Sequence, residues 1–371
     1  MLSAIVSALS LLLIGATLAP LIKSGRWWIR IWDFPRLQLA LLLALTLAAQ
    51  LLMWSGTPLQ MALTGATALC LLWHLRCIFP YTRLRRKQVK AAGRTVSQDQ
   101  AIRLLIANVY QDNRQAHGLF RAIATFDPDV LLVVEADQWW NRRLAAYQHR
   151  YPHHVLHPQS NTYGMLLFSR LEIVEVEVLE RVTPGVPSIK ALIRLRSGAM
   201  IELHCLHPEP PQIGADTKER DAELLLVAKD CVKSPHPIIV CGDMNDVAWS
   251  RTTRLFQRIS GLLDPRIGRG LYPTFDARRW YARWPLDHIF HDKRFLLNRL
   301  QLGSDIGSDH FPIFIELFYQ PEEKDRHEPP RTANERDQKE AEEKIRTGTR
   351  ETPHAEQEPA SVGMTVINQT S

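Results

Sequence analysis

Residues 238–245 read Ile-Ile-Val-Cys-Gly-Asp-Met-Asn, an apolar run that ends abruptly in polar side chains. A short, uninterrupted apolar run bounded by a glycine is typical of a buried strand. Asp243 and Asn245 therefore stand where such a strand would leave its sheet. The arrangement recurs elsewhere in the chain, with Asn108 after residues 104–107, Glu135 after residues 131–134 and His207 at the end of the run that begins at residue 200.

These polar side chains share a chemistry. In sheets covered by helices, strand ends open onto a crevice where ligands bind, so residues from separate strands can converge there. Carboxylate and amide oxygens suit a hard cation such as Mg²⁺, with Mn²⁺ as the alternative, and such a cation stabilises charge on a phosphoryl group. The chain has no G-x-S-x-G, H-E-x-x-H or P-loop motif, which disfavours serine hydrolases, zinc proteases and nucleoside triphosphatases. Phosphate chemistry is therefore favoured over acyl chemistry.

The surrounding segments predict alternating strands and helices. Residues 102–109 and 130–135 are predicted strands with a helix at 115–126 between them, which makes a β-α-β unit. Four strand-like runs without an intervening helix follow, and we expect them to pair antiparallel: 163–169, 171–179, 189–195 and 200–207. The pattern is completed by a helix at 216–232 and strands at 238–241, 286–291 and 311–318. This order predicts an α/β fold with mixed sheets flanked by helices.

The first eighty residues have a different composition. Residues 1–22 carry no charged side chain, and residues 37–54 and 58–79 are nearly as apolar. A helix of about 20 apolar residues can cross a bilayer. We therefore predict three transmembrane helices at about 2–22, 37–54 and 58–79. The two spans behind the first argue against a cleaved signal peptide.

Basic residues flank these apolar segments. The connector 23–36 and the segment 83–94 are both rich in Lys and Arg, whereas the turn at 55–57 has no charge. Two helices separate the basic flanks, so both lie on one side of the membrane, and the positive-inside bias makes that side the cytoplasm. We expect a multi-pass protein of the inner (cytoplasmic) membrane, with the lipid bilayer as a partner and the folded domain in the cytoplasm.

Composition also sets the remaining boundaries. Residues 1–80 are the predicted transmembrane region, 81–100 a basic linker, 101–319 the folded domain and 320–371 a polar tail. The tail has too few apolar side chains to offset its ordering entropy, so we expect it to be disordered. Much of the net charge of +6 lies beside the apolar segments, and it is weak support for a nucleic-acid partner. The five cysteines lack disulfide or metal-ligand spacing, which indicates free thiols.

Six short segments carry a resemblance to a known family. They are Ala107–Val109, Pro128–Glu135, His207–Pro211, Gly242–Asn245, Leu286–Ile289 and Gly307–Pro312. In this order, and at these predicted strand ends, residues 101–319 resemble the endonuclease/exonuclease/phosphatase superfamily, also called deoxyribonuclease-I-like, in its membrane-anchored bacterial type. The resemblance implies a four-layer α/β sandwich that hydrolyses a phosphomonoester or phosphodiester, here preceded by a three-helix transmembrane segment.

The resemblance also implies a metal site. Glu135 would bind the ion with Asn108 nearby, and Asp309 would contribute to the site or support it. The ion would be Mg²⁺, with Mn²⁺ as the alternative.

By the same resemblance, five further residues would act on the substrate. Asp243 would orient or deprotonate the attacking water, and Asn245 would hold a phosphate oxygen. His207 would donate a hydrogen bond to the phosphoryl oxygens. His310 would act as a general acid or base, with Asp287 fixing its tautomer.

The substrate and one structural detail stay open. Family members often use a tyrosine near the middle strands, and Tyr163 is the only obvious counterpart. The loop 274–284 interleaves arginines with aromatics, so it could bind phosphates and stack bases, lie on lipid headgroups, or simply pack as a loop. The expected substrate is a nucleic acid or a phospholipid headgroup. The alternative function is a catalytically silent, membrane-bound binding or scaffold protein, which the complete set of acid, amide and imidazole residues disfavours.

Overall fold

The computed structural model describes residues 1–93, 96–211 and 214–350. The chain forms two compact units. The N-terminal unit contains residues 1–86, 211–217 and 268–270, and the α/β unit contains the rest of the described chain. Each unit has its own hydrophobic core.

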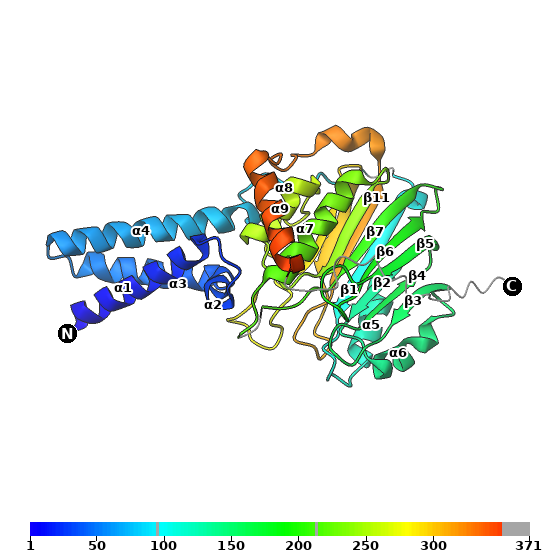
Figure 1. The fold of residues 1–371 in the computed structure, drawn as a ribbon, viewed down its shortest axis with the longest axis horizontal. Helices are drawn as coiled ribbons and strands as arrows, with labels where there is room; N and C mark the ends of the chain where they lie inside the picture. The colour runs from blue at the N-terminus through cyan, green and yellow to red at the C-terminus, as the bar shows by residue number, and fades with distance from the viewer. Residues whose placement is uncertain (94–95, 212–213, 351–371) are drawn as a thin grey trace. The chain divides into compact units, whose positions relative to one another are not determined.

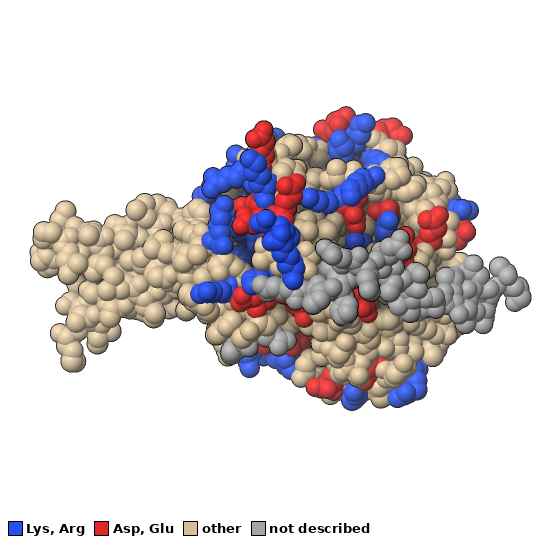
Figure 2. All heavy atoms as spheres, viewed as in Figure 1, with Lys and Arg blue, Asp and Glu red and all other residues tan. Residues whose placement is uncertain are grey.

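The N-terminal unit is built from apolar helices. These are α1 (Leu2–Leu18), the short α2 (Trp27–Arg30), α3 (Arg36–Leu52) and α4 (Pro58–Ile78). Leu13, Leu39 and Leu43 pack between them, and the buried hydroxyls of Ser10 and Thr67 hydrogen-bond to each other at 2.7 Å. The visible face of the long helices carries no charged side chain over most of its length (Figure 2).

The helices of this unit correspond to the three predicted spans. Leu2–Leu21 and Pro58–Tyr81 are long and apolar enough to cross a membrane. Trp27–Asp33 and Arg36–Leu52 form a pair bent by 74°, and this pair supplies a third crossing if it is one span. Two or three helices of this unit therefore have the length and composition of membrane spans.

The α/β unit contains two mixed sheets. Their strands are β1 (Ala101–Asn108), β2 (Val130–Val134), β3 (His153–His157), β4 (Met165–Ser169), β5 (Glu172–Leu179), β6 (Ser188–Arg194), β7 (Met200–Leu206), β8 (Ile238–Asp243), β9 (Asp287–His291), β10 (Phe295–Leu302) and β11 (Ile313–Tyr319). The first sheet has the order β10-β11-β1-β2-β4-β3, and the second has the order β5-β6-β7-β8-β9. The pairs β1–β2 and β7–β8 are parallel, and the other neighbouring pairs are antiparallel.

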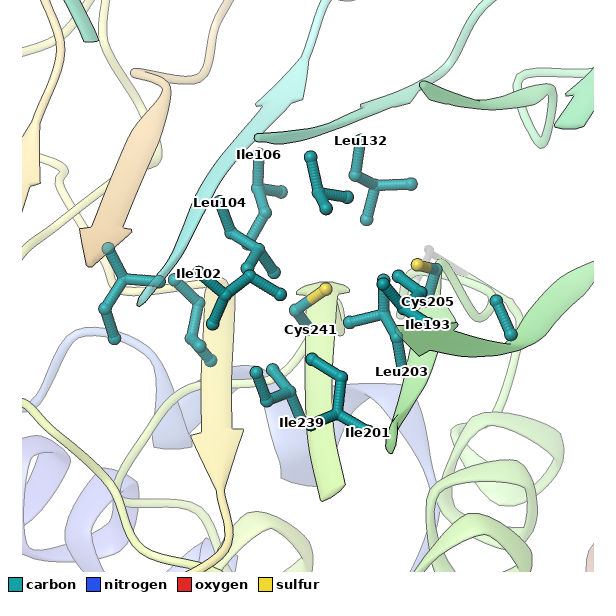
Figure 3. Packing of buried hydrophobic residues seen from close by; sticks show 14 of the residues in the cluster. Ile102, Leu104, Ile106, Leu132, Ile193, Ile201, Leu203, Cys205, Ile239 and Cys241 are labelled. Atoms are coloured by element: carbon teal, nitrogen blue, oxygen red, sulfur yellow. The ribbon is translucent and has the colours of Figure 1, made fainter. Parts of the chain in front are cut away.

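An apolar core lies between the two sheets. Ile102, Leu104 and Ile106 occupy alternate positions of β1 and point toward the second sheet, where Leu203 and Ile239 belong to the same core (Figure 3). Successive side chains of a strand point to opposite faces, so each strand presents one row of side chains to this core.

Helices cover the outer faces of both sheets. They are α5 (His117–Phe126), α6 (Gln138–Leu144), α7 (Lys218–Lys233), α8 (Arg251–Ser260) and α9 (Glu335–Arg350). The other row of β1, with Leu105, packs against Leu119 of α5, while Val240 of β8 packs with Leu224 of α7 and Phe256 of α8. Two mixed sheets flanked by helices form the four layers predicted from the sequence.

The structure differs from the sequence prediction in the C-terminal tail. The sequence predicts a disordered tail over residues 320–371. In the structure, however, Glu335–Arg350 of this segment form helix α9, which lies beside α7 and α8 (Figure 1). Ala341 is fully buried in the core that α9 shares with those helices, and Ile345 packs at its edge. The composition is too polar for an independent fold, but this narrow apolar stripe and its ion pairs order the helix on an existing surface. Residues 351–371 lie outside the described residues.

Candidate active site

The ends of four strands bring the predicted site residues together. Asn108 is the last residue of β1, and Glu135 directly follows β2. His207 directly follows β7, and Asp243 is the last residue of β8. Because β1–β2 and β7–β8 are parallel pairs, the carboxyl ends of each pair lie at the same edge of its sheet. Asp287 begins β9 and is the antiparallel partner of Asp243.

Asn108 connects the two sheets at this edge. Its Nδ2 donates to Glu135 Oε1 at 2.8 Å and to Asp243 Oδ2 at 3.0 Å. Its Oδ1 accepts from the backbone N–H of Tyr110 at 3.0 Å. The buried amide therefore holds two carboxylates from different sheets on either side of it, which fixes both of them.

His310 lies between two aspartates. Its Nδ1 lies 2.7 Å from Asp287 Oδ2, and its Nε2 lies 3.4 Å from Asp243 Oδ2. The Thr274 hydroxyl accepts from the backbone N–H of Asp287 at 3.1 Å and so holds the start of β9. Burial by itself lowers the pKa of His310, but the carboxylates of Asp287 and Asp243 outweigh it and raise the pKa to about 10. The two carboxylates therefore favour the protonated form of the imidazole.

His207 and Asn245 complete the polar cluster. His207 Nε2 lies 4.0 Å from Asp243 Oδ2, and the Tyr163 ring lies 5.6 Å from the His207 ring. Asn245 donates from its backbone N–H to Asp243 Oδ1 at 2.9 Å and from Nδ2 to the Pro208 carbonyl at 2.9 Å. The Nδ2 amino group of Asn245 has two hydrogens, and the bond to the Pro208 carbonyl uses one of them. The loop after β8 is therefore tied to Asp243 by its own backbone.

Asp309 is predicted to serve the metal site, and its carboxylate has a different partner in this structure. Asp309 Oδ2 accepts from Arg278 Nη2 at 2.8 Å, and its backbone carbonyl accepts from the Ala277 N–H at 2.7 Å. Arg278 also lies over the Tyr110 ring, with its guanidinium carbon 5.0 Å from the ring centroid. Asp309 nevertheless contributes to the negative field that raises the pKa of His310.

Glu135 has the surroundings expected of a cation ligand. Desolvation by burial raises the pKa of its carboxyl group. Its contacts are the Asn108 amide and the Gln111 N–H, and no Lys or Arg forms an ion pair with it in the described part of the chain. His207 and His310 lie near enough to offset part of this rise, and a bound cation would stabilise the desolvated carboxylate further. The Glu135 carboxylate is therefore a suitable ligand for a hard divalent ion.

A tighter triad of donor groups is formed by Asp243, Asp287 and His310, whose ligand atoms all lie within 4.8 Å of one another. The Nδ1 atom of His310 is engaged by Asp287 at 2.7 Å, so only its Nε2 atom faces the remaining carboxylate of the triad. These three residues are better suited to holding a proton than to holding an ion. Glu135 remains the more suitable ligand.

The backbone around the site is unusual. Glu135 and Asn245 have φ values of 58° and 49°, in the left-handed region that non-glycine residues rarely adopt. Gly242 has a φ of 136°, and a Cβ atom there would lie 2.0 Å from the carbonyl oxygen of Leu206. Only glycine fits where β8 passes this close to β7, which explains the glycine before Asp243.

Several residues near the site are not among those predicted from the sequence. Phe275 packs against the His310 ring with centroids 5.0 Å apart, and Arg220 on α7 donates to the Asn245 carbonyl at 2.7 Å. His288 Nε2 lies 2.8 Å from the Asp246 carbonyl. An aromatic residue before the Asp287 strand is visible in the sequence, but nothing local to Arg220 shows which loop its side chain reaches.

The fold is an α/β sandwich whose strand ends bring carboxylate, amide and imidazole groups together. A sequence profile described as the Endonuclease/Exonuclease/phosphatase family matches residues 105–310, which is more than half of the chain. The chain belongs to this family. Comparison with curated proteins found no match.

Solved structures share the fold. TDP2 from D. rerio, complexed with a single-strand DNA product, has a TM-score of 0.51 and 18% sequence identity, and the match covers 58% of this chain and 98% of that one. An endonuclease/exonuclease/phosphatase from Bacteroides vulgatus has a TM-score of 0.50 and 15% identity, with coverage of 59% and 99%. At these identities the similarity establishes the fold alone.

Proposed function

We propose that this protein is a membrane-anchored, divalent-metal-dependent phosphoesterase. The observation that carries the proposal is the buried arrangement of His310 between Asp287 and Asp243, with Nδ1 2.7 Å from one carboxylate and Nε2 3.4 Å from the other. A histidine held in one orientation by a carboxylate, next to a second carboxylate that can engage water, suits acid-base chemistry on a phosphate ester. The substrate is a phosphomonoester or phosphodiester, in a nucleic acid or a phospholipid headgroup.

Mg²⁺, or Mn²⁺ in its place, is the proposed cofactor. Glu135 would hold it, with Asn108 fixing that carboxylate and Asp309 contributing once its pairing with Arg278 is exchanged. When bound, such an ion stabilises negative charge that develops on the phosphoryl group. The desolvated carboxyl group of Glu135, which forms no ion pair with a Lys or Arg among the described residues, supports this assignment.

The remaining residues have separate proposed roles. Asp243 orients the attacking water and accepts its proton, since its Oδ2 is fixed by Asn108. Asn245 uses the second hydrogen of its amide for a phosphoryl oxygen. His207 donates to the phosphoryl oxygens, and the protonated His310, with Asp287 behind it, acts as the general acid or as a cationic hydrogen-bond donor. Burial keeps water from screening these charges.

The same proposal includes the domain organisation. Residues 1–80 anchor the chain in the inner (cytoplasmic) membrane as a multi-pass segment, residues 81–100 link it, and residues 101–319 form the catalytic domain. The basic flanks at 23–36 and 83–94 support a cytoplasmic location for that domain. Anchoring raises the local concentration of the site at the bilayer, which favours a lipid-borne phosphate ester without excluding nucleic acid.

A hydrolysis assay on the full chain in detergent micelles tests the proposal. The substrates are bis(p-nitrophenyl) phosphate, p-nitrophenyl phosphate, single-stranded DNA and a phospholipid, each with Mg²⁺ and with EDTA. We expect turnover of at least one substrate that requires the metal. Asp243→Asn and His310→Gln are expected to reduce it by about 10²–10⁴-fold.

The matched control is His154→Gln, which changes a histidine of β3 outside the site. This variant is expected to retain wild-type turnover. Equal turnover in Asp243→Asn and the wild type would exclude the proposed site, and absence of turnover of every substrate would favour the silent binding protein.

A further inference from the structure

Helix α9 packs closely against α7. Ala341 is fully buried among the side chains of α7 and α8. Gly348 lies so near α7 that a Cβ atom there would lie 2.4 Å from the Lys218 carbonyl oxygen and 2.5 Å from Ala222 Cβ. The two helix backbones therefore meet at Gly348, and the matched family region, which ends at residue 310, does not include α9.

Charged side chains hold α9 in place along its length. Glu340 pairs with Arg251 of α8, and Asp337 pairs with Arg258 at 3.0 Å. Lys344 reaches inward, and its Nζ lies 2.5 Å from Oδ2 of Asp221 on α7. Asp221 is only 1% exposed, so Lys344 places a cationic group against a buried carboxylate.

Asp221 divides its two oxygens between different partners. Oδ2 accepts from Lys344 and from the Thr252 hydroxyl at 2.7 Å. Oδ1 accepts from Arg220 twice, from Nε at 3.2 Å and from Nη2 at 2.8 Å. Because Lys344 and Thr252 occupy one oxygen, the other stays aligned with the Arg220 guanidinium. This two-point contact fixes the plane of the guanidinium group.

The third nitrogen of Arg220 faces the candidate active site. Arg220 Nη1 donates to the backbone carbonyl of Asn245 at 2.7 Å. Asn245 has the left-handed φ of 49°, a conformation that persists only when its surroundings impose it. The bond from Arg220 is one such constraint, and it acts on the same residue whose N–H is bonded to Asp243.

We infer that Arg220 is a positioning residue for Asn245 and that α9 keeps Arg220 in place through Lys344 and Asp221. The inference rests on the proposed function, since Asn245 is there assigned to the phosphoryl group. Three successive contacts connect Lys344 to Asn245: Lys344 to Asp221 at 2.5 Å, Asp221 to Arg220 at 2.8 Å, and Arg220 to Asn245 at 2.7 Å. Helix α9 is thus a part of the catalytic architecture added beyond the matched family region.

Substitutions of Arg220 and of Lys344 in the full chain test the inference. Arg220→Lys keeps the positive charge beside Asp221, but its single nitrogen cannot occupy the separate positions from which Nε, Nη2 and Nη1 of Arg220 reach Asp221 and Asn245. We expect kcat for bis(p-nitrophenyl) phosphate to fall by about tenfold or more with little change in KM. Lys344→Met is expected to lower kcat by about threefold, and Lys344→Arg to restore it.

Lys229→Met is the matched control, because Lys229 pairs with Glu342 at 3.7 Å across the same α7–α9 contact without reaching Asp221. It is expected to leave kcat unchanged. The inference is overturned if Arg220→Lys has wild-type kcat, or if Lys229→Met lowers kcat as much as Lys344→Met does. A loss of kcat that merely follows the loss of thermal stability in both variants would also overturn it.

Amide hydrogen exchange of the segment 243–247 gives a readout that needs no turnover. Release of the Asn245 carbonyl is expected to speed exchange in this segment in Arg220→Lys and Lys344→Met, but not in Lys229→Met. Faster exchange in a chain without hydrolytic activity would refute the proposed function and retain the positioning role. Unchanged exchange in an active chain would refute the positioning role and retain the function.

Discussion

Glu223 predicts a pH-dependent stability that can be measured without knowing the substrate. This residue of α7 is 2% exposed, and its Oε1 has no hydrogen-bond partner among the described residues. Burial raises the pKa of Glu223 to about 8, partly offset by Arg181 and reinforced by Glu209. An unfolded glutamate has a pKa of 4.5, so the folded protein holds a proton that the unfolded chain releases at neutral pH.

The size of the effect follows from the two pKa values. Below pH 4.5 both states are protonated and Glu223 imposes no penalty. Between pH 4.5 and pH 8 the folded state binds more protons, so the free energy of unfolding falls as the pH rises. At pH 7 the difference covers about 2.5 pH units at about 1.4 kcal/mol each, which is about 3.5 kcal/mol. Glu223→Gln removes the ionisation and keeps the shape, so it should be more stable than the wild type by about this amount at pH 7.

Thermal unfolding of the full chain in detergent at pH 4, 5, 6, 7 and 8 measures this. The midpoint of Glu223→Gln should match the wild type at pH 4 and exceed it by roughly 7–14 °C at pH 7. Glu175→Gln, at an exposed position of β5, is the control and should follow the wild type at every pH. Parallel curves for Glu223→Gln and the wild type would refute the reasoning, because the buried carboxyl would then ionise as freely as an unfolded one.

Three further outcomes are expected. Gly242→Ala should destabilise the α/β unit by about 1–3 kcal/mol and remove activity, because its Cβ would lie 2.0 Å from the Leu206 carbonyl; chemical denaturation and the turnover assay measure both. EDTA should abolish turnover and Mg²⁺ or Mn²⁺ should restore it, as a titration of rate against metal concentration will show; full rate after chelation would exclude the metal site. Joint replacement of Arg278, Arg279 and Arg283 by Ala should raise KM about tenfold, or about 1.4 kcal/mol; unchanged KM would make the loop a packing element.

Much of the fold is predictable because the decisive patterns are local. The strands that carry the site are mostly apolar runs, although β1 contains Arg103 and β7 contains Glu202 and His204. Each run ends at a polar residue that the structure also finds at or directly after a strand end: Asn108, Glu135, His207 and Asp243. A buried strand that is covered on both faces needs apolar side chains on both faces. The strand and the polar residue that ends it can therefore be recognised from consecutive residues of the sequence. The convergence of these residues follows from the parallel pairing of the strands.

The elements that escape prediction depend on distant parts of the chain. Strand β3 (His153–His157) contains three histidines and little of an apolar pattern, yet it pairs with β4 at the sheet edge. Helix α8 buries Thr252, Thr253 and Gln257, because those side chains find polar partners or cover from other elements. Helix α9 forms because α7 and α8 provide a surface for Ala341. Such partners are separated by many residues, so no local window contains the information.

The strained backbone at the strand ends distinguishes between the two functions considered for this fold. Glu135, Asn245 and Tyr110 have φ values of 58°, 49° and 54°, and all three lie at or beside the buried polar cluster. A non-glycine residue in this region of φ is unfavourable, and a glycine would relieve the strain without disturbing the strands. A scaffold that only had to keep its fold would gain nothing from a desolvated Glu135 carboxylate in such a conformation, close to the carboxylate of Asp243. A cation at the Glu135 carboxylate and a ligand at the Asn245 amide would give both conformations a purpose. The combination therefore favours catalysis over a silent binding role.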